Sequence, residues 1–203
     1  MIVLNSSDAQ ATLQPYFSVI RRVVDGAWQD WLDNPLAAQM QHKRVRAMCV
    51  WNQFIARSRR EFAGNADTQV TTLKEWEGLL FHDSVFMRFK KGSRELLSRN
   101  YPTSLALAYN DQKQDLFKGV SRLELIYVLD PSETEVDRIC IVQRHRNQIV
   151  WWLDVKGAAD DAAQNILPFP PVEPNGLPVA ERVLKSKRRQ ERDDGRDELD
   201  GAS

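Results

Sequence analysis

The stretch from residue 123 to 155, LELIYVLDPSETEVDRICIVQRHRNQIVWWLDV, is the part of this chain that most constrains its fold. It contains three apolar runs separated by two polar turns, one at Asp130-Pro131 and the other at Arg146-Asn147. Apolar runs of this length, broken by turn residues, predict a three-stranded antiparallel meander. Because a sheet with an apolar face is not stable alone in water, we expect the rest of the chain to cover it.

Two adjacent tryptophans indicate how much of this sheet is covered. Neighbouring residues of a strand point to opposite faces, so Trp151 and Trp152 would lie on different faces of the meander. Either helices cover both faces, or one of the two rings contacts another chain.

The chain before the meander predicts helices first. Apolar residues at three- and four-residue spacing predict one helix over 12–33, beginning near Pro15, and a second over 36–62. The expected apolar stripe of the second helix includes Met48, then Trp51 or Asn52, and Ile55. The short Asn34-Pro35 break between the two helices favours an antiparallel helical pair.

Shorter elements are expected between this pair and the meander. Residues 70–76 are consistent with a short strand, and 79–89 predict a hairpin that turns at His82-Asp83. A third helix is expected from Thr103 to about Phe117. The predicted fold class is therefore α+β, with the helical pair and the later helix packed on an antiparallel sheet made of the hairpin and the meander.

The domain organisation follows from a change in composition. We expect a single α+β domain over 1–156, followed by a Pro-rich and charged tail over 157–203 that is largely disordered. No apolar run is long enough to span a membrane, and MIVLNSSD lacks the basic start of a signal peptide, so a cytoplasmic protein is expected. Cys49 and Cys140 are interpreted as reduced thiols, and no metal or cofactor is expected.

Net charge does not identify a partner, because 28 basic residues balance 28 acidic ones. Local clusters are more informative. The segment 88–99, RFKKGSRELLSR, combines a predicted strand end, a Gly92-Ser93 turn with free backbone N–H groups, and cations suited to phosphate or a nucleic-acid backbone. A second basic group lies in the last turn of the meander. The binding candidates are Arg88, Lys90, Lys91, Arg94, Arg99, Arg144 and Arg146. The alternative is a solvated basic surface without a ligand.

Two catalytic patterns occur in the meander. Asp154 is followed two residues later by Lys156, with Asp137 upstream, which is typical of metal-dependent nucleases that hold a divalent ion with carboxylates. The alternative is that Asp154 and Lys156 only mark the solvent edge of the sheet.

The order of elements from about 94 to 155 resembles the small ribosome-dependent RNA-cleaving toxins of the RelE type. This resemblance implies basic and acid/base side chains that act on RNA from the sheet, and Arg144, His145 and Arg146 are the residues of suitable type.

Two functional classes follow from these patterns. The favoured hypothesis is a non-enzymatic binding protein whose partner is another protein, a second copy of the chain, or a nucleic acid contacted through 88–99. The alternative is a phosphodiester-cleaving enzyme, either a metal-dependent nuclease or a RelE-like RNase, that uses the meander.

Overall fold

The structure is a computed structural model that describes residues 3–98 and 103–157. Its helices are α1 (Ser6–Leu13), α2 (Phe17–Leu32), α3 (Lys43–Glu61) and α4 (Ser104–Asn110), with 3-10 turns η1 (Gln14–Tyr16) and η2 (Ala37–Gln39). Its strands are β1 (Thr68–Leu73), β2 (Trp76–Phe81), β3 (Val85–Lys91), β4 (Ser121–Leu129), β5 (Val136–His145) and β6 (Gln148–Asp154).

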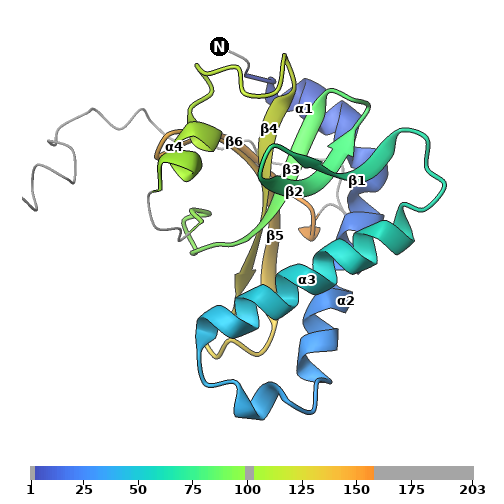
Figure 1. Cartoon of the computed structure of the whole chain (residues 1–203), viewed down its shortest axis with the longest axis vertical. Helices are drawn as coiled ribbons and strands as arrows, with labels where there is room; N and C mark the ends of the chain where they lie inside the picture. The colour runs from blue at the N-terminus through green and yellow to red at the C-terminus, as the bar shows by residue number, and fades with distance from the viewer. Residues whose placement is uncertain (1–2, 99–102, 158–203) are drawn as a thin grey trace, which may run out of the picture. The chain divides into compact units, whose positions relative to one another are not determined.

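All described residues belong to one compact unit, Met1–Ile166 (Figure 1). The predicted disordered tail lies outside the described residues apart from Gly157, and so does Arg99. Within the described part of the chain, no helix has the length and apolar character that a membrane crossing requires.

The six strands form one sheet in the order β1-β2-β3-β4-β5-β6, which confirms the α+β fold class. The β2–β3 hairpin and the β4–β5–β6 meander are both antiparallel, as the sequence predicts. The two halves join through β3 and β4, however, and that pair is parallel. The sheet is therefore mixed rather than wholly antiparallel, because the chain crosses over through α4 before it returns as β4.

The N-terminal helices differ from the prediction at two breaks. The helix expected over 12–33 is divided by η1, since Pro15 lacks an N–H and is tolerated only in the first turn of a helix. The second helix begins at Lys43 rather than at residue 36, because η2 forms a separate turn before it. The two long helices pack together through an ion pair in which Arg57 Nη2 lies 2.5 Å from Asp30 Oδ1.

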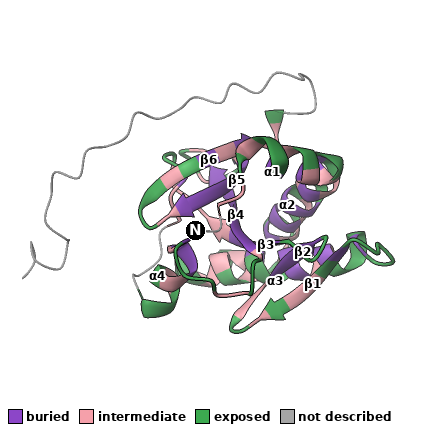
Figure 2. Ribbon diagram, turned by 90° about the horizontal axis from the view of Figure 1, so that it is seen from above, coloured by how far each residue is buried: buried purple, intermediate pink, exposed green. Residues whose placement is uncertain are grey.

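Helices α1, α2 and α3 cover one face of the sheet, here called the helix face, and α4 lies on the other, here called the α4 face (Figure 2). The main apolar core lies between the helices and the helix face, where strand residues such as Met87, Leu125 and Trp151 are buried. Smaller apolar clusters lie on the α4 face. Trp152 packs there beside Ile149, because a bulge at Gln143/Arg144 changes the alternation of β6.

Helix α4 is shorter than predicted and ends at Asn110 rather than near Phe117. Its start is as expected, since the Thr103 side chain accepts a hydrogen bond from Ala106 N at 3.2 Å. Its end is set by Arg122, whose guanidinium donates to the carbonyl oxygens of Ala108, Asp111 and Gln114 at 2.8–3.0 Å. Ala108 lies in the last turn of α4, Asp111 is the C-cap residue, and Gln114 lies beyond the helix.

Candidate binding groove

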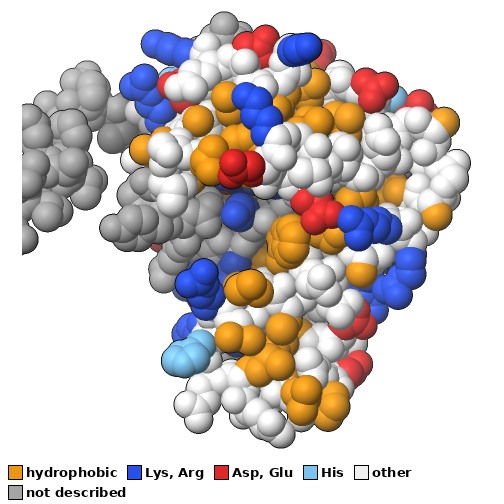
Figure 3. Space-filling model, in the orientation of Figure 1, with side chains coloured by type: hydrophobic (Ala, Val, Ile, Leu, Met, Phe, Trp, Pro, Cys, Tyr) orange, Lys and Arg blue, Asp and Glu red, His pale blue; other side chains and the backbone are white. Residues whose placement is uncertain are grey.

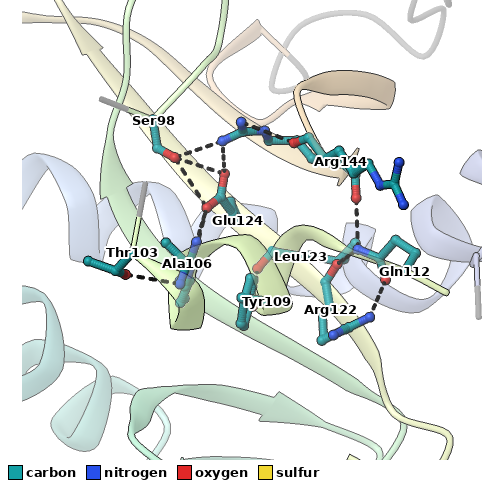
Figure 4. A network of polar contacts seen from close by, with 11 residues as sticks. Ser98, Thr103, Ala106, Tyr109, Gln112, Arg122, Leu123, Glu124 and Arg144 are labelled. Carbon is teal, nitrogen blue, oxygen red and sulfur yellow. Dashed lines mark hydrogen bonds and ion pairs between the residues drawn. The ribbon is translucent and has the colours of Figure 1, made fainter. Parts of the chain in front are cut away.

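A buried ionic cluster on the α4 face holds two of the predicted binding residues (Figure 4). Arg88 lies beside Glu124 on the parallel β3–β4 pair, and its Nη2 approaches Glu124 Oε1 at 2.6 Å. Arg144 of β5 donates from Nη1 to Glu124 Oε2 at 3.1 Å and to Ser98 Oγ at 2.8 Å. We call Arg88, Ser98, Glu124 and Arg144 the Glu124 cluster.

The electrostatics of the Glu124 cluster indicate a structural role for both arginines. Burial alone would raise the pKa of Glu124, but the neighbouring Arg88 and Arg144 bring it below its ordinary value, so the carboxylate is ionised. Arg88 also stacks on the Tyr109 ring of α4, with its guanidinium carbon 3.7 Å from the ring centre. Neither guanidinium is therefore free to hold a nucleic-acid backbone.

The turn between β5 and β6 is docked against the end of α4. His145 Nδ1 accepts a hydrogen bond from Gln112 N at 3.3 Å and lies 3.8 Å from Asp111 Oδ1. Arg146 N donates to Asn110 O at 2.7 Å, while the exposed Arg146 side chain lies 3.9 Å from Asp111. This geometry explains the basic turn as a contact with α4.

The residues of the nuclease pattern are not brought together. In the β5–β6 register Asp154 pairs with Cys140, three residues beyond Asp137, and three residues of strand span about 10 Å. Asp154 Oδ1 accepts hydrogen bonds from the N–H groups of Lys156 and Gly157, and the Lys156 ammonium donates to Val136 O. No group of three or more His, Cys, Asp or Glu side chains within residues 3–98 and 103–157 is arranged to hold a metal ion.

A groove of about 830 Å³ lies at the end of the sheet where β3 and β4 finish, between that end and α3. We call it the α3 groove. On the face shown in Figure 3, apolar side chains are exposed beside charged ones. The groove is lined by Lys43, Ala47, Met48, Trp51, Phe54, Phe89, Lys90, Lys91, Gly92, Ser93, Arg94, Tyr127, Val128, Leu129, Asp130, Pro131 and Glu133.

The α3 side of the groove carries large apolar side chains that are exposed. Met48 is 61% and Trp51 37% exposed, although the sequence placed both on the buried stripe. The buried stripe of α3 contains Ile55, as expected, together with Val50 and Phe54. Apolar residues of α3 form two stripes on different sides of the helix, and spacing alone does not tell which one is buried. The stripe that contains Phe54 packs on the sheet, because the Phe54 ring contacts the Phe89 and Tyr127 rings.

Most charged side chains of the groove are already paired. Glu133, in the β4–β5 turn, bonds to Arg46 and lies 3.2 Å from Lys43 Nζ and 2.9 Å from Lys91 Nζ. The hydrogen bond from Arg46, followed by that from Lys91, lowers the pKa of Glu133 to about 2. Asp130 is held by the hydroxyl of Ser132 and by backbone N–H groups of its own turn, which keep its pKa below its usual range.

Lys90 and Arg94 differ from these residues. Neither has an ion pair within the described part of the chain, and both line the groove. The N–H groups of Gly92 and Ser93 are not available to a phosphate, because Gly92 N donates to Tyr127 O and Ser93 N donates to Leu97 O, both at 3.0 Å.

Comparison of this chain with protein-family models, with curated protein sequences and with solved structures finds no match.

Proposed function

We propose that this protein is a binding module whose α3 groove holds a segment of a partner protein. The observation that carries the proposal is the exposure of Met48 and Trp51 along a groove whose floor is aromatic. Trp is strongly enriched among residues that dominate binding energy at protein interfaces, and Met adapts to irregular apolar partners.

The floor of the groove consists of packed aromatic rings and presents one polar group. Phe54, Phe89 and Tyr127 are buried against one another, with the Phe54 ring centre 5.1 Å from that of Phe89 and 5.2 Å from that of Tyr127. The Tyr127 hydroxyl has no hydrogen-bond partner among the described residues. An apolar floor with a small number of polar groups is typical of sites that orient a ligand.

The charges of the groove favour a peptide over a nucleic acid. Recognition of a phosphate backbone uses several free cations along one surface. Here Arg88 and Arg144 are buried in the Glu124 cluster, and Lys91 is paired with Glu133. Lys90 lies on the same face of β3 as Arg88, so Arg94 is the remaining lining cation, and it suits a partner segment with apolar anchors and an acidic residue.

The test is selection of displayed random peptides on the full-length protein, followed by synthesis of any consensus peptide with a fluorescent label. We expect a consensus with apolar anchors and an acidic position. Trp51→Lys should weaken binding of that peptide, measured by anisotropy, by about thirtyfold, the loss typical of an interface hot spot. Val150→Lys is the matched control, since Val150 is 43% exposed but does not line the groove.

Two outcomes would overturn the proposal. One is the absence of any consensus, or equal binding by wild type and Trp51→Lys. The other is tight binding of a labelled single-stranded RNA that falls with salt and with Lys90→Glu plus Arg94→Glu but is unchanged by Trp51→Lys. That pattern would assign the surface to nucleic acid instead.

A further inference from the structure

We infer that the partner segment held in the α3 groove is proline-rich, and that the side chains of the groove bind its carbonyl groups and one acidic residue. The inference rests on the proposed function, because it names the class of peptide that this same groove takes.

The side chains that line the groove have their acceptors occupied and several donors free. Of the two carboxylates, Glu133 is held by three cations and Asp130 by N–H groups of its own turn. Within the described residues, the Trp51 indole N–H and the Tyr127 hydroxyl have no hydrogen-bond partner, and the Arg94 guanidinium has no ion pair. A ligand in the groove therefore meets free donors but no free carboxylate.

Trp51 differs from two tryptophans that are fixed in the core. The indole N–H groups of Trp28 and Trp151 donate to the carbonyl oxygens of Thr134 and Leu4 at 2.8 and 2.7 Å. The Trp51 ring is 37% exposed and makes no such bond within the described residues. It therefore offers a ligand both an apolar ring face and a hydrogen-bond donor.

This balance of donors and acceptors favours a peptide that brings carbonyl groups but few N–H groups. A peptide N–H that is buried without an acceptor is costly. Proline has a carbonyl and no N–H, and a polyproline II backbone makes no internal hydrogen bonds, so its carbonyls are free to accept. Such segments dock in aromatic-lined grooves. A helical segment suits the free donors less well, because most of its carbonyls are bonded within the helix.

The charge of the groove favours one acidic position in the segment. The Lys90 side chain does not contribute, since it points to the α4 face. The other charged residues of the lining are three cations and two carboxylates, an excess of one positive charge: Lys43, Lys91, Arg94, Asp130 and Glu133. Because Lys43 and Lys91 lie beside Glu133, Arg94 is the cation left for the peptide.

The probe is the synthetic peptide LPFPPVEP, which repeats residues 167–174 of this chain and contains four prolines and one glutamate. Its binding to the full-length protein is measured by anisotropy of a fluorescent label. We expect saturable binding that Tyr127→Phe, which removes only the hydroxyl, weakens by about three- to tenfold. Val150→Lys is the control and should bind as wild type does, since Val150 is exposed outside the groove.

Two changes in the peptide test the groups that it presents. Alanine in place of each proline restores four N–H groups and should weaken binding by about tenfold or more, whereas N-methylalanine, which also lacks an N–H, should retain most of the affinity. Glutamine in place of the glutamate should weaken binding to wild type by about fivefold but leave binding to Arg94→Met unchanged, because the charged partner is then already absent.

No saturable binding of the probe, or equal binding of its alanine version, would overturn the inference. A proline-free consensus peptide whose binding depends on Trp51 would overturn it too, yet leave the proposed function standing. Absence of both a consensus and probe binding would remove both. Tighter probe binding by full-length Pro170→Ala plus Pro171→Ala would mean that the chain's own segment competes for the groove, which would overturn the assignment to a partner.

Discussion

Glu124 is the residue that holds the buried arginines of the α4 face in place. Its carboxylate is 2% exposed and accepts hydrogen bonds from Arg88 and Arg144, which come from the strands on either side of β4. A buried carboxylate with two guanidiniums is held in place by its partners, and removing the central charge leaves both guanidiniums buried without an anion.

We therefore predict that Glu124→Gln lowers the free energy of unfolding by about 3–5 kcal/mol in urea denaturation at neutral pH. The control is Glu61→Gln, which breaks an exposed pair with Arg22 and should cost less than about 1 kcal/mol. A loss at Glu124 no larger than that of the control would contradict the structural role of the cluster.

The pH dependence of this loss has a defined sign. The pKa of Glu124 is lowered from its ordinary value of 4.5, so its contribution to stability is complete above that pH. The contribution disappears as pH falls through the lowered value in the folded state. The difference between wild type and Glu124→Gln should therefore shrink in acid and stay constant above about pH 5.5, one unit above the ordinary pKa.

The same residues show what the sequence could predict of the site. Alternation along β3 puts Arg88 on the face opposite Met87 and Phe89, which are buried in the main core. Its partner could not be predicted, because Glu124 lies 36 residues away and meets Arg88 through the parallel pairing of β3 with β4. The basic segment was therefore recognised, but which of its cations are paired depends on strand register.

At the scale of elements, α3 decides where the groove lies. One side of the helix packs through Phe54, which is 1% exposed, and the other presents Met48 to solvent. The sequence spacing is compatible with burial of either side of α3. Hydrophobic periodicity indicates an apolar stripe, but it does not show which of two overlapping stripes is buried. The long helices and the hairpin were predictable because their patterns are local.

The two sides of α3 should respond differently to substitution. We predict that Met48→Gln changes the free energy of unfolding by no more than about 0.5 kcal/mol, as expected for an exposed position. Phe54→Ala should cost about 3–5 kcal/mol, because it leaves a cavity against Phe89 and Tyr127. Thermal or urea unfolding of both variants measures this, and comparable losses would mean that the orientation of α3 is wrong.

At the scale of the whole described unit, the parallel β3–β4 pair joins a hairpin half to a meander half. Its register runs without interruption from Val85–Ser121 to Lys91–Tyr127. No local pattern in the sequence predicts this pairing, because it depends on the path of the crossover through α4 rather than on a turn between neighbours. For that reason the sequence predicted both halves of the sheet but not the parallel β3–β4 pair that joins them.

Gly92 lies at the end of the β3–β4 pair, where the chain leaves β3. A Cβ built on Gly92 would lie 2.3 Å from Ile126 Cγ2 on β4, while Gly92 N holds Tyr127 O at 3.0 Å. We predict that Gly92→Ala costs about 1–3 kcal/mol, because the two strands must separate locally to admit the methyl group. Ile126→Ala removes the atom that causes the clash, so the loss in the double variant should be smaller than the sum of the single losses by about 1 kcal/mol. Urea unfolding of wild type, the two single variants and the double variant gives this coupling. Additive losses would show that Gly92 and Ile126 are not in contact across the β3–β4 pair.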